Sequence, residues 1–259
     1  MNNSLAMVDE TLEELIFLIC KVRGAPPEIL QRSIDYKEQK QKEGYSVHNP
    51  NTDTNQDDPI GYDICIVNKE AIRKSIEVHT LWDPTSTGSR FDLSMAFYAS
   101  KKLVIANEDE LKKPFDEYTR FLLKYSNSPL VRKSKFYNRM MEEKNMIMRQ
   151  EEPFSFLIDT ERFGDKKYTE GGYMNALYIF GLIFMADKPI NLVNSGKLMD
   201  YELKKDVKLF KKPKEEGKEI VTKTFNKVLL CYNYTCNGGK PEDFYNKYLE
   251  ERDKLLKVA

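Results

Sequence analysis

The segment WDPTSTGSRFDLSMAFYASKKLVIAN, residues 82–107, constrains the fold of this chain more than any other. A run typical of a strand, Ile76–Trp82, leads into a turn of small polar residues, Asp83–Ser89. The segment Arg90–Ser100 has the pattern of an amphipathic helix, and Leu103–Ala106 is a short apolar strand. Strand, loop, helix and strand in this order predict a βαβ unit of a parallel sheet.

The polar loop of this unit is a candidate ligand site. Parallel sheets bind ligands beyond the carboxyl ends of their strands, and a helix N-terminus there attracts an anion. Asp92 is predicted to lie in the first turn of the helix, where a carboxylate can meet a ligand. In an alternative interpretation Ser89 is the N-cap and Asp92 completes a capping box, so that Asp92 holds the loop instead.

The residues from Gly88 to Ala96, followed by Lys101–Ile105, resemble the nucleoside 2-deoxyribosyltransferase-like family. Its members carry the pattern D-x-G-[ST]-x-x-[ED]-x-G-x-A and then a lysine-led apolar strand. In that family the acid at the position of Asp92 is usually glutamate, and it attacks the anomeric carbon of the sugar. The resemblance implies the same role for Asp92, although this acid is one methylene shorter and Ser94 replaces the usual glycine. It also implies a flavodoxin-like parallel sheet with helices on both faces, and no metal or cofactor.

Cleavage of an N-glycosidic bond passes through an oxocarbenium-like state, which a carboxylate beneath the ring can stabilise or attack. A second acid protonates the departing base or activates water. Asp83 begins the same loop as Asp92 and is the predicted second acid. Predicted substrate-binding residues come from this loop and from the loop after the first strand: Arg23, Gly24, Trp82, Thr87, Gly88 and Ser89.

Two of these residues carry a more specific expectation. Arg23 would suit a phosphate through charge-assisted hydrogen bonds, which would make the substrate a nucleotide rather than a nucleoside. Trp82 could stack on a nucleobase, but beside an apolar strand it could equally belong to the core.

Composition excludes several classes of function. The chain has 259 residues, of which 41% are hydrophobic, so it can bury a sizeable core. Its 41 basic and 41 acidic residues balance, which argues against a nucleic-acid partner. The longest apolar run, Ala176–Ala186, is about 11 residues, well short of the roughly 20 that span a bilayer. None of the four cysteines forms a CxxC pair and the chain has two histidines, so the sequence predicts no zinc site. With no signal-peptide pattern, we expect reduced cysteines and a cytoplasmic protein.

The chain divides into three predicted segments. Residues 12–107 form the α/β core, with a buried strand at Glu14–Cys20 and a helix that begins near Pro26 and ends at Gly44. Residues 108–150 read as a helical insertion or linker. Residues 151–259 either complete the sheet or form a degenerate second copy of the fold. Within the first segment, Asn49–Pro59 reads as a surface loop.

The third segment repeats the order strand, loop, helix and strand, which is the basis for the second-copy interpretation. Under either interpretation this segment could contribute to the site, and its predicted contributors are Asp159, Glu170, Asn191 and Asn194. The last helix, Glu242–Val258, could cover an edge of the sheet or pair with another copy of the chain as a homo-oligomer.

The sequence therefore predicts cleavage or transfer at the N-glycosidic bond of a small-molecule nucleoside or nucleotide, with Asp92 as the nucleophile. Two alternatives remain open. One is a non-catalytic nucleotide-binding module that keeps the pocket, and the other is an NAD glycohydrolase.

Overall fold

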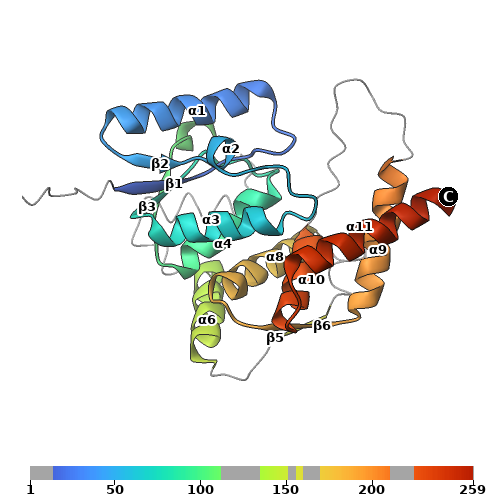
Figure 1. Cartoon of the computed structure of the whole chain (residues 1–259). Helices are drawn as coiled ribbons and strands as arrows, with labels where there is room; N and C mark the ends of the chain where they lie inside the picture. The colour runs from blue at the N-terminus through green and yellow to red at the C-terminus, as the bar shows by residue number, and fades with distance from the viewer. Residues whose placement is uncertain (1–13, 112–134, 151–155, 160–169, 211–224, 259) are drawn as a thin grey trace, which may run out of the picture.

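The computed structural model of the chain describes residues 14–111, 135–150, 156–159, 170–210 and 225–258 (Figure 1). Within these residues, four parallel strands form the main sheet in the order β2-β1-β3-β4. They are β1 (Leu15–Ile19), β2 (Ser46–His48), β3 (Glu77–Thr80) and β4 (Lys102–Ile105). The predicted α/β class with a central parallel sheet is therefore confirmed. The order matches the first strands of a flavodoxin-like sheet, and that closer assignment stays a prediction.

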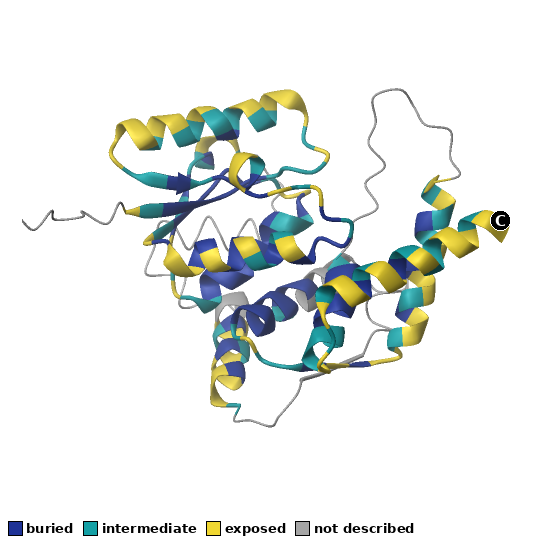
Figure 2. Ribbon diagram, in the orientation of Figure 1, coloured by how far each residue is buried: buried dark blue, intermediate teal, exposed yellow. Residues whose placement is uncertain are grey.

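Helices cover both faces of the main sheet. They are α1 (Pro27–Lys42), α2 (Pro50–Asp53), α3 (Tyr62–Lys74) and α4 (Thr87–Tyr98). Every residue of β1 after Leu15 is buried (Figure 2), as its continuous apolar run predicts. Phe17 and Ile19 pack into the core that holds α3 and α4, whereas Ile16 and Leu18 pack towards α1. Successive side chains of a strand point to opposite faces, so β1 requires a helical layer on each side.

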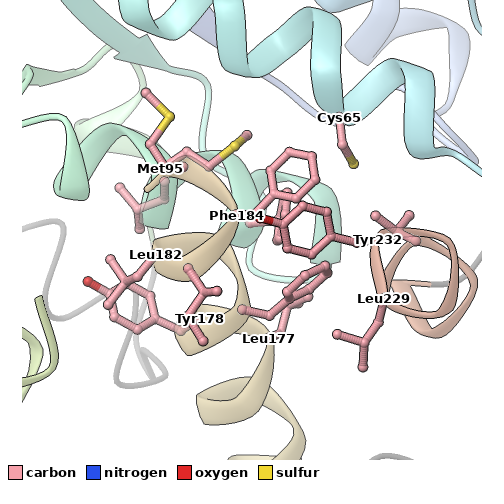
Figure 3. Close-up of a cluster of buried hydrophobic side chains, with 14 of the residues drawn as sticks. Cys65, Met95, Leu177, Tyr178, Leu182, Phe184, Leu229 and Tyr232 are labelled. Carbon is pink, nitrogen blue, oxygen red and sulfur yellow. The ribbon is translucent and has the colours of Figure 1, made fainter. Parts of the chain in front are cut away.

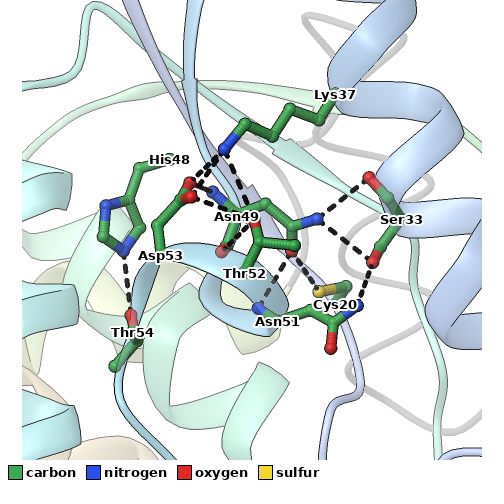
Figure 4. Close-up of polar contacts among 9 residues, drawn as sticks. All are labelled: Cys20, Ser33, Lys37, His48, Asn49, Asn51, Thr52, Asp53 and Thr54. Atoms are coloured by element: carbon green, nitrogen blue, oxygen red, sulfur yellow. Dashed lines mark hydrogen bonds and ion pairs between the residues drawn. The ribbon is translucent and has the colours of Figure 1, made fainter.

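Residues 49–59 do not form the surface loop that their composition predicts. Helix α2 interrupts them, and Asn49, Thr54 and Asp58 are buried. Asn49 accepts a hydrogen bond from the backbone at the start of α2 and donates to Ser33 of α1 (Figure 4). Asp58 accepts from four backbone N–H groups around the start of α3. These polar side chains are buried because they satisfy the backbone, and they hold the segment beside the carboxyl end of β1.

The C-terminal half forms a smaller βαβ unit and a layer of helices. Strands β5 (Phe156–Asp159) and β6 (Ile190–Val193) pair in parallel, and α8 (Glu170–Met185) lies between them in the chain. These two strands form a sheet of their own and do not extend the main sheet. The remaining long helices of the described residues are α6 (Lys135–Arg149), α9 (Ser195–Phe210), α10 (Phe225–Cys236) and α11 (Pro241–Val258). The choice between a second copy and an elaborated single domain stays a prediction.

Helices α4 and α8 join the two halves in one hydrophobic core (Figure 3). Phe91 of α4 contacts Phe180 and Phe184 of α8, with ring centroids 5.3 and 5.5 Å apart. Residues 89–97 of α4 are buried without interruption, so the prediction of an amphipathic helix here is wrong. The side of α4 that would otherwise face solvent is covered by α8. Helix α4, which carries Asp92, is therefore held on all sides.

Candidate functional site

A cavity of about 210 Å³ lies beyond the carboxyl end of β1. Its walls come from the loop directly after β1, the segment before α3, helix α3, the start of α4, and α10. The position agrees with the rule that parallel sheets bind ligands beyond the carboxyl ends of their strands. Both halves of the chain contribute to the cavity, since α10 belongs to the C-terminal half.

Asp92 lines this cavity and is 7% exposed. Among the described residues its hydrogen-bond partner is Asn68 of α3, whose Nδ2 lies 3.4 Å from each carboxylate oxygen. Burial raises the pKa of Asp92 to about 7, and the hydrogen bonds from Asn68 lower it only in part. A buried carboxylate with so little compensation lowers stability, and such groups concentrate at functional sites.

The start of α4 determines where Asp92 points. Ser86 is the N-cap, and its hydroxyl accepts from the backbone N–H of Ser89 at 3.2 Å. The helix therefore begins at Thr87, three residues before the predicted Arg90, and Asp92 lies in its second turn rather than its first. The interpretation of Ser89 as N-cap and Asp92 as capping-box acid is wrong. Asp92 has no part in the cap and faces the cavity.

Asp83, the predicted second acid, does not line the cavity. Its Oδ1 accepts from the backbone N–H and hydroxyl of Thr85 at 2.7 and 2.6 Å, and its Oδ2 pairs with Lys21 at 3.2 Å. Burial acts to raise the pKa of Asp83, but these hydrogen bonds and the ion pair outweigh it and lower the pKa. A carboxyl group with a lowered pKa is a poor proton donor near neutral pH. Asp83 therefore stabilises the loop before α4 through Thr85 and Lys21.

The predicted binding residues separate into two groups. Arg23, Thr87 and Gly88 line the cavity together with Lys21, which the sequence did not single out. Arg23 lies close over Gly61, with its Nη1 3.5 Å from where a Cβ would stand. The cavity is thus bordered by two cationic side chains and by the N-terminus of α4, which carries a partial positive charge. These groups are opposite in charge to the carboxylate of Asp92.

The other group does not line the cavity. Gly24 is exposed at a left-handed turn, with φ +65°, and Ser89 is buried within the helix cap. Trp82 is 3% exposed in the hydrophobic core, where its backbone pairs with the side chain of Asn107. Of the two readings of Trp82, the structure favours the core.

Two of the four predicted contributors from the C-terminal half, Asn191 and Asn194, do not line the cavity. Asn191 and Asn194 are exposed on β6 and just after it. For Asp159 at the end of β5 and Glu170 at the start of α8, the structure describes the backbone alone. Among the described residues of this half, Phe225 and Val228 of α10 line the cavity.

Sequence reasoning also missed Asn68, although a signal for it exists. Asn68 is polar, yet it falls on the same helical face as Cys65 and Ile72, at spacings of three and four residues. All three residues are buried. A polar residue on the apolar face of a predicted helix is a reason to expect a buried partner.

Comparison of the chain with family models, with curated proteins and with solved structures gave no significant match. Across the part of the chain that the structure describes, no group of three or more His, Cys, Asp or Glu residues is placed to hold a metal ion. In the same part, every helix is too short or too polar to cross a lipid bilayer.

The raised pKa of Asp92 predicts how its replacement changes stability. Folding raises this pKa from 3.8 to about 7, so the folded state binds the proton more tightly, and the resulting stabilisation is lost as pH rises towards 7. Asp92→Asn is therefore expected to raise the free energy of unfolding at about pH 8, and to raise it less at about pH 4. Urea unfolding at both pH values measures the difference. The exposed Asp200→Asn is the matched control, and an equal change at both pH values for Asp92→Asn would contradict the prediction.

Proposed function

We propose that this chain cleaves or transfers at the N-glycosidic bond of a nucleoside or nucleotide, with Asp92 as the nucleophile. The observation that carries the proposal is a buried carboxylate with a pKa raised to about 7, at the wall of a cavity beyond a parallel sheet. This is the environment that a carboxylate nucleophile needs, because it is poorly solvated and still ionises near neutral pH.

In the proposed reaction, an oxygen of Asp92 attacks the anomeric carbon as the bond from that carbon to the base nitrogen breaks. The electron pair of this bond leaves with the base, which takes up a proton. Water then attacks the glycosyl-enzyme and releases the sugar, or a second base does so and completes a transfer. Of the cavity-lining residues that the structure describes, Asp92 is the sole carboxylate, so water supplies the proton in this mechanism.

The remaining walls support a ligand with one apolar and one anionic part. Ile60, Ile64 and Val228 offer an apolar surface for the flat faces of a base. Lys21 and Arg23 lie where a phosphate or other anionic group of the substrate would be attracted.

The cavity size bears on the NAD alternative. Its volume of about 210 Å³ is below the roughly 300–1,000 Å³ of pockets for drug-sized ligands. A ligand with one base and one sugar suits this volume better than a dinucleotide does. We therefore favour nucleosides and mononucleotides over NAD as substrates.

The test is to incubate the purified chain separately with deoxynucleosides, deoxynucleoside monophosphates and NAD, and to measure free base by chromatography. We expect free base from a mononucleoside or its phosphate, and more from the phosphate if Lys21 and Arg23 bind it. Saturable binding without free base would overturn the enzymatic proposal in favour of a nucleotide-binding module. Free nicotinamide from NAD alone would favour the glycohydrolase.

A further inference from the structure

A chain of hydrogen bonds leads from the end of β2 to the carboxylate of Asp92. Nε2 of His48 lies 3.0 Å from Oγ1 of Thr54, and this hydroxyl donates to Oδ1 of Asn68 at 3.1 Å. Nδ2 of Asn68 then faces both oxygens of Asp92 at 3.4 Å. Figure 4 shows the first of these contacts, with His48 above Thr54. Four segments of the first half thus meet in one polar chain.

The direction of this chain follows from the chemistry of Thr54. A hydroxyl has one hydrogen to donate, and here it goes to the amide oxygen of Asn68. The oxygen of Thr54 must therefore accept from His48, which requires the proton of His48 to be on Nε2. With its oxygen held by Thr54, the amide of Asn68 can present only its NH₂ group to Asp92.

The reverse direction would have a different consequence. If the amide of Asn68 rotated by half a turn, its oxygen would face the carboxylate of Asp92. Two acceptors in contact repel each other unless Asp92 carries a proton and donates it. The orientation of one amide therefore selects between an ionised and a protonated Asp92.

We propose that Thr54 and His48 are positioning residues, which hold the amide of Asn68 with its NH₂ group towards Asp92 and so favour the ionised form of that carboxylate. The catalytic meaning of this arrangement rests on the proposed function, whereas its effect on the protonation of Asp92 does not. Thr54 and His48 lie outside the cavity wall, so neither is expected to touch a ligand.

The titratable and charged groups that face these hydrogen bonds come from both layers of the first half: Cys20, Cys65, Arg23, His48, Lys37 and Asp53. Cys20, directly after β1, and Cys65 of α3 also line the cavity, and burial raises the pKa of Cys20 to about 12 and that of Cys65 well above its usual range. Arg23 stays charged at any pH used. Burial lowers the pKa of His48, with Lys37 of α1 acting in the same direction and Asp53 of α2 opposing it.

The proposal is tested by titrating the side-chain carboxyl carbon of Asp92 by NMR, in the full chain labelled with ¹³C-aspartate, from about pH 5 to about pH 9. The signal is assigned by its loss in Asp92→Asn. Thr54→Val removes the hydroxyl, and we expect the midpoint of Asp92 to rise by about one pH unit. Thr54→Ser restores the hydroxyl and should restore the wild-type midpoint. Thr52→Val makes the same change two residues away, where the hydroxyl bonds Asp53 instead of Asn68, and should leave the midpoint unchanged.

An unchanged midpoint in folded Thr54→Val would overturn the proposal, as would an equal rise in Thr52→Val. If Thr54→Val does not fold, His48→Phe carries the test, because it removes the donor to Thr54 and keeps a ring against Phe17. We expect a smaller rise of the Asp92 midpoint in His48→Phe than in Thr54→Val. An unchanged midpoint in His48→Phe would overturn the proposal. A shifted midpoint in a chain that releases no base from any substrate would leave the positioning role intact and refute the proposed function alone.

Discussion

Asp92→Asn is expected to lower the rate of base release by at least about a thousandfold, while the chain still binds its substrate. Asparagine has nearly the same shape and can keep the contact with Asn68, but its amide cannot attack the anomeric carbon. The same variant is expected to be more stable than the wild type above neutral pH, because it removes a buried charge. Lower activity with higher stability is the pattern of a residue retained for function rather than for folding.

Base release is measured under single-turnover conditions for the wild type, Asp92→Asn and Asp200→Asn. Asp200 is an exposed carboxylate on α9, so Asp200→Asn should retain wild-type activity. Activity in Asp92→Asn within about tenfold of the wild type would exclude Asp92 as the nucleophile. If that activity disappeared in Glu170→Ala, the chemistry would have to be placed in the C-terminal half.

Gly181→Ala is expected to destabilise the chain by about 2–3 kcal/mol, the largest effect on stability that we predict for a single added methyl group. A Cβ at Gly181 would lie 1.8 Å from Oγ of Ser94 and 3.1 Å from the backbone oxygen of Phe91. Ser94 is fully buried and its hydroxyl donates to that same oxygen at 2.7 Å, so it cannot turn away without losing a buried hydrogen bond. Helices α4 and α8 would have to separate.

Urea unfolding of three variants tests this prediction. Gly196→Ala is the matched control, since Gly196 is also helical but has nothing within 4 Å of an added Cβ. It should be neutral or stabilising, because alanine favours a helix over glycine. Ser94→Ala combined with Gly181→Ala should recover part of the loss. Equal stability of Gly181→Ala and the wild type would show that the contact between α4 and α8 is looser than described.

Several elements could be predicted because a few neighbouring residues specify them. The apolar run of β1 predicts a strand buried on both faces. Pro27 at the start of α1 and Gly44 after its end are local signals that the structure follows, with φ +96° at Gly44. The sequence predicts a last helix that begins at Glu242, and in the structure this helix begins at Pro241.

Other elements could not be predicted, because distant segments determine them. Helix α4 has polar residues that suggest an exposed face, yet α8 buries that face, and α8 lies about 80 residues later in the chain. Residues 49–59 are rich in turn-forming side chains, yet Asn49 and Asp58 are buried because they bond to the backbone at the starts of α2 and α3. Propensity describes a segment alone, and packing with other segments overrides it.

The candidate site divides in the same way. The sequence alone predicts an acid after a strand and a polar turn. It can do so because the period of the hydrophobic pattern and the residue types of a turn are local properties. Other properties of the site depend on which side chains meet in space. They are the pKa of Asp92, its contact with Asn68, the position of Asp83 outside the cavity wall, and the part of that wall that α10 supplies. Burial and hydrogen bonding between remote segments set these properties, because the free energy of a charge depends on everything that surrounds it and not on its neighbours in the chain.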